Sequence, residues 1–309
     1  MVASAPASIV YEKGGAIYVA SNSGAGSRQL ALGKKPQLSP DGVTVIYISA
    51  DNKIFRVPAV GGMSTQIAPD LTCENCAFEF AEDSSSLVSL SSGIRRVPLD
   101  GSASAYVARG DTWGQSLSPD GKKVAFATGT LDDCGDDDKV CEGNPFIAVV
   151  PVADGTPRQI TDYGLFPIWT RRGIVFSDDF PLKGTESESR IFRVNANGKA
   201  RKLLRRNRYK SLNDLGSEAP YFRAGPDVLT AEFGRKRKVT YRIVSTASGR
   251  VLARRAFDDR RLKTFSVNGR TAYTISRSGR LQSVNLKTGK RRTLISRGVV
   301  DVNAGNTRF

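Results

Sequence analysis

The densest group of side chains with chemical potential in this 309-residue sequence is an acidic segment, residues 131–142, which also contains two cysteines. Carboxylates packed this closely repel one another unless solvent or a cation screens them, and hard oxygen ligands are those that Ca²⁺ prefers. The spacing does not match the calcium-binding loop of an EF-hand. We therefore expect either a Ca²⁺ site or a solvated acidic loop, formed by Asp132, Asp133, Asp136, Asp137, Asp138 and Glu142.

The four cysteines form two local pairs, Cys73 with Cys76 and Cys134 with Cys141. An even number of cysteines in local pairs, in an exported protein, predicts two disulfides. The second disulfide would close the acidic segment. Two alternatives stay open at this stage: a single zinc site that uses all four thiolates, and a redox-active Cys-x-x-Cys pair at residues 73–76.

The chain contains no histidine. This excludes histidine as general acid or base, the Ser-His-Asp and Cys-His nucleophile systems, and histidine metal ligands. We therefore predict that the protein is not an enzyme. The enzymatic alternative is a polysaccharide lyase or glycosidase, and it would have to use metal-assisted carboxylates, with Asp178, Asp179 and Asp162 as the candidates.

Charge is distributed unevenly along the chain, whose net charge is +16. Residues 1–150 contain 12 basic and 17 acidic residues, whereas residues 151–309 contain 34 and 13. A basic half indicates an anionic partner, such as a phosphate- or carboxylate-bearing polymer, nucleic acid or a membrane surface. A basic surface that only keeps the protein soluble is the alternative interpretation.

One short turn occurs twice and sets the organisation of the chain. Leu38–Gly42 and Leu117–Gly121 share the sequence Leu-Ser-Pro-Asp-Gly, and an apolar segment rich in β-branched residues soon follows each copy. Proline presets φ for a turn, aspartate accepts hydrogen bonds from the backbone, and glycine adopts the positive φ that closes a hairpin. Each copy therefore predicts a tight turn between two strands, and a repeated turn indicates a repeat protein.

Strand-like segments separated by Gly, Asp, Asn and Ser continue through the whole sequence. Six units of four strands fit between residues 36 and 294, three strands precede them at residues 9–30, and one follows at residues 299–302. Three N-terminal strands and one C-terminal strand make a further unit that closes a ring and removes open sheet edges. We predict an all-β, seven-bladed β-propeller of four-stranded antiparallel blades, with six blades as the rival. Residues 1–309 would form a single domain with a disordered tail at residues 1–7.

The pattern Pro-x-[Leu/Trp]-Ser-Pro-Asp-Gly, followed by an apolar strand and then by a strand such as Ile54–Val57, resembles the TolB-type β-propeller repeat. Fragments of the pattern recur at residues 167–173, 220–222 and 265–269. The resemblance covers nearly the whole chain, without the N-terminal α/β domain of TolB itself. It implies an exported, non-catalytic protein that binds other envelope proteins.

The longest connections in this arrangement are expected on one face of the ring. In a four-stranded blade with strands A to D, the B–C turns and the D–A crossovers share one end of the sheet. The long segments 129–144, 177–189 and 205–218 fall in such connections, and long loops on a rigid scaffold are where binding usually occurs.

The candidate binding residues on that face are aromatic, acidic and basic. Aromatic rings beside carboxylates can stack on sugars or hold a peptide, although packing between blades is the simpler role for Trp113 and Phe166. The basic cluster near residue 205 would match a partner of uneven charge. The predicted binding residues are Asp111, Trp113, Asp162, Tyr163, Asp178, Asp179, Arg205, Arg206, Arg208 and Tyr209.

Taken together, the sequence predicts a non-catalytic binding scaffold that recognises a protein or an anionic envelope polymer through its long-loop face. No apolar run reaches the length of a membrane span, and no motif for specific nucleic-acid recognition is present. The small residues of Met1–Ala7 resemble the segment that follows a signal cleavage site. We therefore expect an extracytoplasmic monomer that is secreted, periplasmic or associated with the cell wall.

Overall fold

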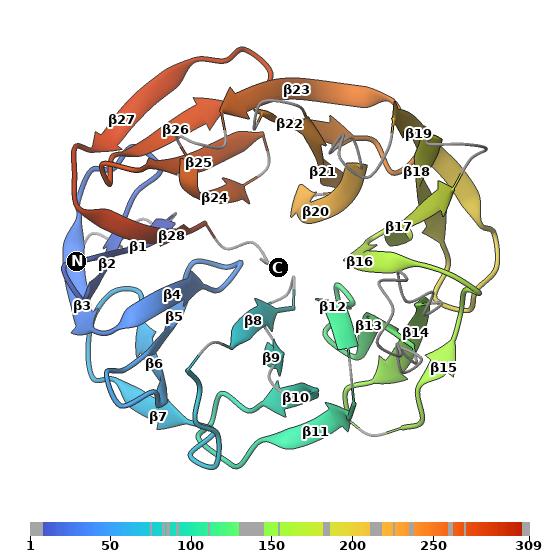
Figure 1. The fold of residues 1–309 in the computed structure, drawn as a ribbon. Coiled ribbons are helices and arrows are strands. Elements are labelled where there is room, and N and C mark those ends of the chain that lie inside the picture. Colours follow the sequence, from blue (N-terminus) through green and yellow to red (C-terminus); the bar gives the residue numbers. More distant parts are fainter. Residues whose placement is uncertain are drawn as a thin grey trace, which may run out of the picture.

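The computed structural model describes residues 9–74, 76–81, 84, 87–90, 93–110, 112–129, 145–153, 155–181, 186–210, 218–224, 226–234, 238–258, 262–268 and 270–304. Within these residues every regular element is a β-strand, and the strands form seven four-stranded antiparallel sheets. Figure 1 shows the sheets arranged as blades around a central axis. The predicted seven-bladed propeller is confirmed. The predicted tail at residues 1–7 lies outside the described residues.

Strand A of each blade lies next to the ring axis and strand D lies at the outside (Figure 1). In the order of blades 1 to 7, strand A is β28 (Val299–Asn303), β4 (Lys34–Leu38), β8 (Ala77–Phe80), β12 (Thr112–Leu117), β16 (Leu165–Thr170), β20 (Glu218–Ala224) and β24 (Leu262–Asn268). Strand B is β1 (Ile9–Lys13), β5 (Thr44–Ile48), β9 (Leu87–Leu90), β13 (Lys123–Thr128), β17 (Gly173–Pro181), β21 (Asp227–Gly234) and β25 (Thr271–Ser276).

The two outer strands of each blade follow in the same order. Strand C is β2 (Ala16–Ala20), β6 (Ile54–Pro58), β10 (Ile94–Val97), β14 (Phe146–Pro151), β18 (Glu186–Val194), β22 (Lys238–Val244) and β26 (Leu281–Asn285). Strand D is β3 (Arg28–Leu32), β7 (Thr65–Ile67), β11 (Ala105–Ala108), β15 (Arg158–Gln159), β19 (Lys202–Lys210), β23 (Val251–Asp258) and β27 (Arg291–Ile295).

Blade 1 joins the two ends of the chain, as the sequence predicts. The C-terminal strand β28 pairs with the N-terminal strand β1, with Tyr11 opposite Val302. The side-chain oxygen Oδ1 of Asn303 then accepts a hydrogen bond of 3.1 Å from the amide of Leu38 in blade 2. This closure leaves no open edge between the first and last blades. The rival with six blades is therefore wrong.

The two Ser-Pro-Asp-Gly turns connect strands A and B of blades 2 and 4. Gly121 has φ +65°, and the hydroxyl of Ser118 donates a 2.6 Å hydrogen bond to the Asp120 carboxylate. This bond, and to a smaller extent a second bond from the amide of Lys122, lowers the pKa of Asp120 below its usual value. The charged carboxylate therefore stabilises the turn, and Asp120 has the structural role that its position predicts.

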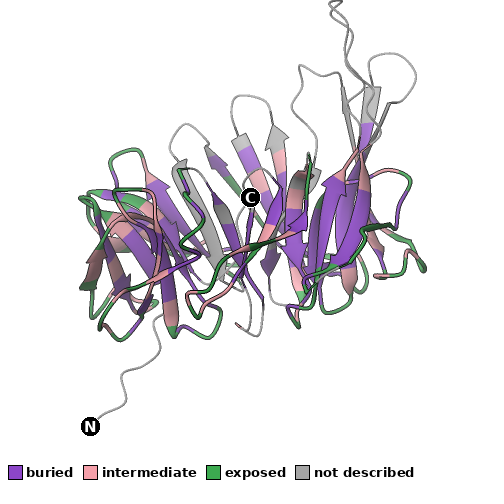
Figure 2. Cartoon of the chain, turned by 90° about the horizontal axis from the view of Figure 1, so that it is seen from below, coloured by how far each residue is buried: buried purple, intermediate pink, exposed green. Residues whose placement is uncertain are grey.

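The apolar core lies between the blades, and β13 shows how one strand contributes to the core on both of its faces. In β13, Val124 and Phe126 pack toward blade 3, whereas the alternate residues Ala125 and Ala127 pack toward blade 5. This alternation is the period of two expected for a strand. Figure 2 shows buried residues running through the thickness of the ring, with exposed residues at the turns.

Basic side chains tie the outer edges of neighbouring blades together. In four cases an arginine or lysine of strand D donates a hydrogen bond to a backbone carbonyl in the C–D turn of the next blade. These contacts, called the carbonyl clamps below, are Arg28 to Val60 (2.6 Å) and Ala59 (2.7 Å), Arg158 to Ala196 (2.7 Å), Lys202 to Ala247 (2.7 Å) and Arg255 to Lys287 (2.7 Å). Some of the basic side chains therefore stabilise the packing of neighbouring blades.

The two ends of the blades form two faces of the ring. The A–B face carries the A–B and C–D turns, including both Ser-Pro-Asp-Gly turns. The B–C face carries the B–C turns and the D–A crossovers. Strands D form the outer wall between these faces (Figure 1).

Candidate functional site

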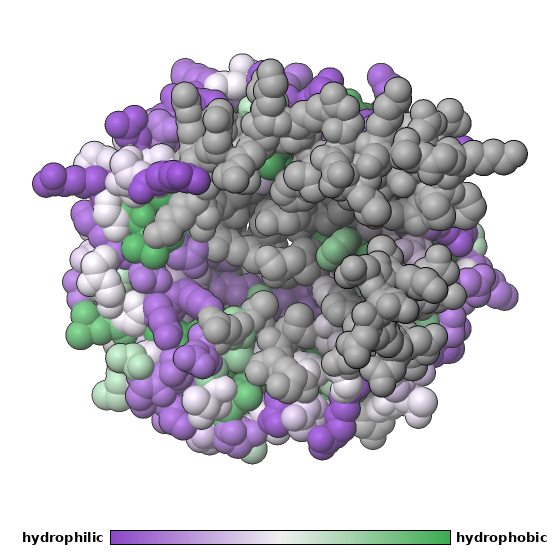
Figure 3. All heavy atoms as spheres, in the orientation of Figure 1, coloured by the Kyte–Doolittle hydropathy of each residue, from purple (hydrophilic) through white to green (hydrophobic). Residues whose placement is uncertain are grey.

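The B–C face was predicted to carry three long loops, and the structure corrects two of them. Segment 177–189 is mostly strand, because β17 extends to Pro181 and β18 begins at Glu186. Cross-strand pairs in register, from Ser177–Ile191 to Pro181–Ser187, extend the hairpin. Figure 3 views the molecule from this face. Segment 130–144 lies outside the described residues.

The basic cluster at residues 205–210 was also predicted to lie in a loop, and it does not. These residues continue β19, where they pair with β18 on the outside of blade 5. The Nη1 atom of Arg206 lies 3.7 Å from the Oε1 atom of the buried Glu188. Arg205 is half-buried, and the backbone of Arg208 pairs with that of Glu188 across the two strands. Tyr209 pairs with Ser187 in the same ladder.

Asp178 was predicted as a candidate for binding or catalysis, and in the structure it forms two ion pairs. Its carboxylate is 5% exposed, and Oδ2 lies 2.9 Å from Arg190 and 3.1 Å from Arg201. The guanidinium of Arg201 also stacks over the ring of Phe192 at 4.0 Å. The two arginines supply the opposite charge that a buried carboxylate needs. The backbone of Asp179 continues β17.

The D–A crossover from blade 4 to blade 5 brings two predicted residues to the B–C face. Asp162 is exposed and Tyr163 is half-buried. After the preceding crossover, Trp113 is the second residue of β12 and pairs with Ala127, and Asp111 lies outside the described residues. The structure therefore places Asp162 and Tyr163 together in one crossover between blades.

Phe166, the second residue of β16, has a left-handed backbone conformation. Its φ is +52°, and 39% of the residue is exposed. The inner strands of blades 2 and 4 have an equivalent bulge, where Lys35 has φ +51° and Gly114 has φ +64°. A bulky residue in the left-handed region is a genuine outlier, and such outliers cluster at functional sites. Part of Phe166 is therefore covered, and the remainder is exposed to solvent.

A buried ion pair crosses the ring axis, and the sequence did not indicate it. Glu79 in blade 3 is fully buried, and its carboxylate lies 3.7 Å from the guanidinium of Arg223 in blade 6. Arg223 also donates a 2.8 Å hydrogen bond to the carbonyl of Leu117 in blade 4. The hydroxyl of Ser116 lies between Glu79 (3.2 Å) and the amide of Trp169 in blade 5 (2.8 Å). Four blades therefore meet in one polar network at the axis.

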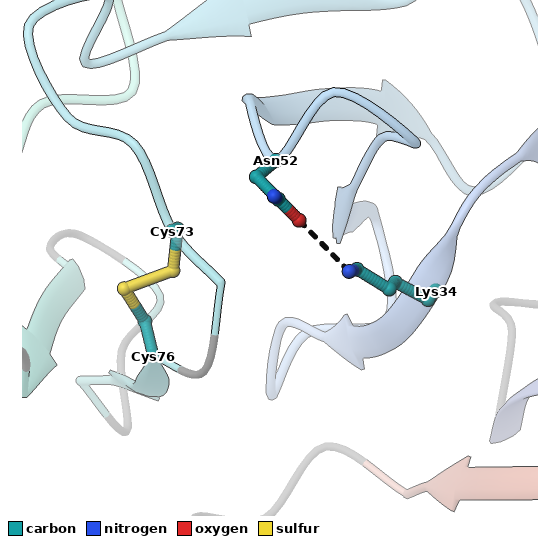
Figure 4. The surroundings of a disulfide bond; sticks show 4 residues. All are labelled: Lys34, Asn52, Cys73 and Cys76. Carbon is teal, nitrogen blue, oxygen red and sulfur yellow. Dashed lines mark hydrogen bonds between the residues drawn. A yellow bond between two sulfur atoms is a disulfide. The ribbon is translucent and has the colours of Figure 1, made fainter.

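The first predicted disulfide is present. Cys73 and Cys76 are bonded in the crossover from blade 2 to blade 3, and the amide of Cys73 donates to the carbonyl of Asn52 at 2.8 Å. Figure 4 shows this disulfide near the hydrogen bond between Lys34 and Asn52. The bond removes the two thiolates that the zinc alternative would need here. A disulfide fits an oxidising compartment.

The second cysteine pair and the proposed Ca²⁺ ligands fall in segment 130–144, outside the described residues. Among the residues that the structure does describe, no group of three or more acidic, cysteine or histidine side chains is arranged to hold a metal ion. The described part of the chain also contains no helix long and apolar enough to cross a membrane.

Solved structures share this fold at low sequence identity. Tricorn protease superposes with a TM-score of 0.65 and 11% identity, over 97% of this chain and 34% of the protease chain. The oligogalacturonate lyase of Vibrio parahaemolyticus gives 0.59 and 10%, over 94% and 87%. AztD from Citrobacter koseri gives 0.54 and 12%, over 97% of both chains. Such similarity indicates a common fold and does not carry function.

No protein-family model matches the sequence, and no curated protein matches it. The chain spans about a third of the tricorn protease chain, 34% of its length. The TolB-type repeat therefore stays a prediction, whereas the seven-bladed propeller is established by the arrangement of the strands.

Proposed function

We propose that this protein is a non-catalytic, extracytoplasmic binding scaffold that recognises a protein or an anionic envelope polymer through its B–C face. The observation that carries the proposal is Phe166, a bulky aromatic residue held at φ +52° and 39% exposed at the start of an inner strand. An exposed aromatic ring with a strained backbone suits a recognition contact, because such strain persists only where the surrounding structure enforces it.

The neighbouring residues support the same face. Asp162 is exposed only four positions before Phe166, in the crossover that leads into the same strand. Glu79 and Arg223, which meet across the axis, are buried, so we expect a partner to contact the exposed rim of the face. A rigid ring that displays crossovers and turns at its edge is a common support for binding residues.

The enzymatic alternative, a polysaccharide lyase or glycosidase, has no described observation in its favour. Its best candidate carboxylate, Asp178, is held by Arg190 and Arg201. The chain also supplies no histidine for proton transfer. Ca²⁺ binding by residues 132–142 is retained as part of the proposal, and so is export, which the Cys73–Cys76 disulfide supports.

The test is partner capture by a Phe166→Asn variant. Asn tolerates the left-handed region better than Phe, so the fold should keep its urea midpoint. If Phe166 contacts the partner, capture from a cell-envelope extract of the source organism should fall by about tenfold, in line with the loss of an aromatic anchor.

Lys35→Asn is the matched control, because Lys35 occupies the equivalent bulge in blade 2 at φ +51°. It should leave capture unchanged. Equal capture by wild type and by Phe166→Asn would contradict the proposed role of this face. A polysaccharide substrate turned over by the wild-type protein would support the enzymatic alternative instead.

A further inference from the structure

The outer wall of blades 5, 6 and 7 carries basic residues that the repeat itself does not require. In these blades the C–D turn and strand D correspond to residues 195–210, 245–258 and 285–295, which contain seven, three and four basic residues and one acidic residue, Asp258 at the end of β23. We call these three segments the basic wall. Figure 1 shows their strands β19, β23 and β27 on consecutive blades at the outer edge.

Blades 1 to 4 provide an internal comparison. Their equivalent segments are residues 21–32, 58–67, 97–108 and 151–160, which together contain two arginines and two aspartates. Because the same turn and outer strand form there without excess charge, the charge of the basic wall is not a requirement of the fold. It explains much of the basic character of the second half of the chain.

Structural contacts account for only some of the basic wall. Lys202 and Arg255 make carbonyl clamps, and Arg28 and Arg158 make the same contact in blades 1 and 4. Arg201 and Arg206 of the wall pair with buried carboxylates of blade 5.

A second group of wall residues makes no such contact among the described residues. These side chains are exposed, and among the described residues none of them forms a hydrogen bond or an ion pair: Lys199, Arg250, Arg254, Lys287, Lys290 and Arg292. Charged side chains without counter-ions on one surface create a positive potential that favours an anionic partner.

The clamps make the three segments one continuous surface. Lys202 of β19 donates to the carbonyl of Ala247, which places blade 5 against the turn that carries Arg250. Arg255 of β23 donates to the carbonyl of Lys287, in the turn that leads to β27. The basic wall therefore curves around three consecutive blades without a break.

We propose that the basic wall binds a flexible polysaccharide that carries carboxylate groups. The wall is convex, so a planar membrane would touch only a narrow strip of it, and duplex DNA is too stiff to follow it cheaply. Among the wall residues whose side chains are described, Phe257 is the aromatic one, and it is buried. Single-stranded nucleic acid is bound partly by stacking its bases on exposed aromatic rings. That part of the wall has no such ring.

The arrangement of the arginines favours carboxylate groups. A guanidinium matches a single carboxylate with two parallel hydrogen bonds. Phosphate sites more often gather several donors around one group. Arg254 and Arg292 lie on different outer strands, β23 and β27, which suits separate carboxylates along a chain. This inference goes beyond the function proposed above, since the wall lies outside the B–C face.

The experiment compares binding to alginate, a uronate polymer, by two variants of equal net charge. The wall variant is Arg254→Glu, Lys290→Glu and Arg292→Glu. The control is Arg96→Glu, Lys122→Glu and Lys123→Glu, three exposed residues of blades 3 and 4. Urea midpoints of both variants, compared with wild type, show that the fold is retained.

We expect wild type to bind alginate at low ionic strength and not to bind neutral dextran. The Kd should rise by about tenfold in the wall variant and by less than about twofold in the control. Added salt should weaken the wild-type complex, because screening shortens the range of exposed charges.

Three results would overturn the proposal. The first is no binding of alginate by wild type, and the second is an equal loss in both variants. The third is tighter binding to single-stranded DNA or to phosphatidylserine vesicles than to alginate, which would assign the wall to a different class of partner. The Phe166→Asn experiment is read separately, so failure of one does not decide the other.

Discussion

Replacement of Arg223 by Met should lower the free energy of unfolding by about 3–5 kcal/mol, the usual cost of breaking a buried ion pair by removing one partner. The change removes a cation 3.7 Å from the fully buried carboxylate of Glu79. It also removes the donor to the carbonyl of Leu117, so contacts between blade 6 and blades 3 and 4 are lost together. Urea unfolding of the purified variant measures the effect.

The double variant Glu79→Gln with Arg223→Met separates the ion pair from simple packing. With the carboxylate neutral, no buried charge lacks its counter-ion, and a substantial part of the lost stability should return. Additive losses in the double variant would show that the two residues do not stabilise the axis as a pair.

The second large effect is expected for Gly249→Ala, with a loss of about 3 kcal/mol from a strained backbone and an overpacked contact. Gly249 lies in the C–D turn of blade 6 at φ +79°. A Cβ added there would lie 2.1 Å from the carbonyl oxygen of Leu204 in β19 of blade 5. The backbones of Gly249 and Leu204 cannot shift easily to relieve this contact. The measurement is again the urea midpoint.

Gly26→Ala is the matched control, because it measures the cost of the left-handed backbone conformation alone. Gly26 has φ +65° in the C–D turn of blade 1, and a Cβ there would meet nothing within 4 Å. Its cost should be about 1 kcal/mol, from the left-handed conformation alone. Equal losses for both glycines would show that contact with the neighbouring blade contributes nothing.

The fold was predictable because its signals are local and repeated. The Ser-Pro-Asp-Gly turns fix the boundary between strands A and B, and the count of strands at the two ends implies the closure through β28. Strand lengths were less predictable. Polar residues such as those near Asp178 indicate a loop when they are considered alone, and only pairing with a neighbouring strand makes them part of a hairpin.

The network at the axis could not be predicted from local pattern, since its members come from blades far apart in the sequence. One signal was present in the repeat register. Arg223 pairs with Val228 at the position that Leu38, Leu117 and Trp169 occupy in other blades. A charged residue at a repeat position that is otherwise apolar therefore marks a special contact.

The basic charge had two competing interpretations, and the structure separates them residue by residue. Arg28 and Arg158 in blades 1 and 4 show that a basic residue at the outer edge can serve the fold alone. Arg254 and Lys290 have no such contact among the described residues, and they belong to the basic wall. Sequence composition could not distinguish these two groups, because both contribute equally to the net charge.

Site-specific photo-crosslinking in the living source organism tests recognition through the B–C face most directly. A photo-reactive residue replaces Asp162, exposed on the B–C face, or Lys122, exposed on the A–B face. Discrete adducts from position 162 and none from position 122 are the expected result. Adducts from position 122 without adducts from position 162, or equal yields from both, would contradict recognition through the B–C face.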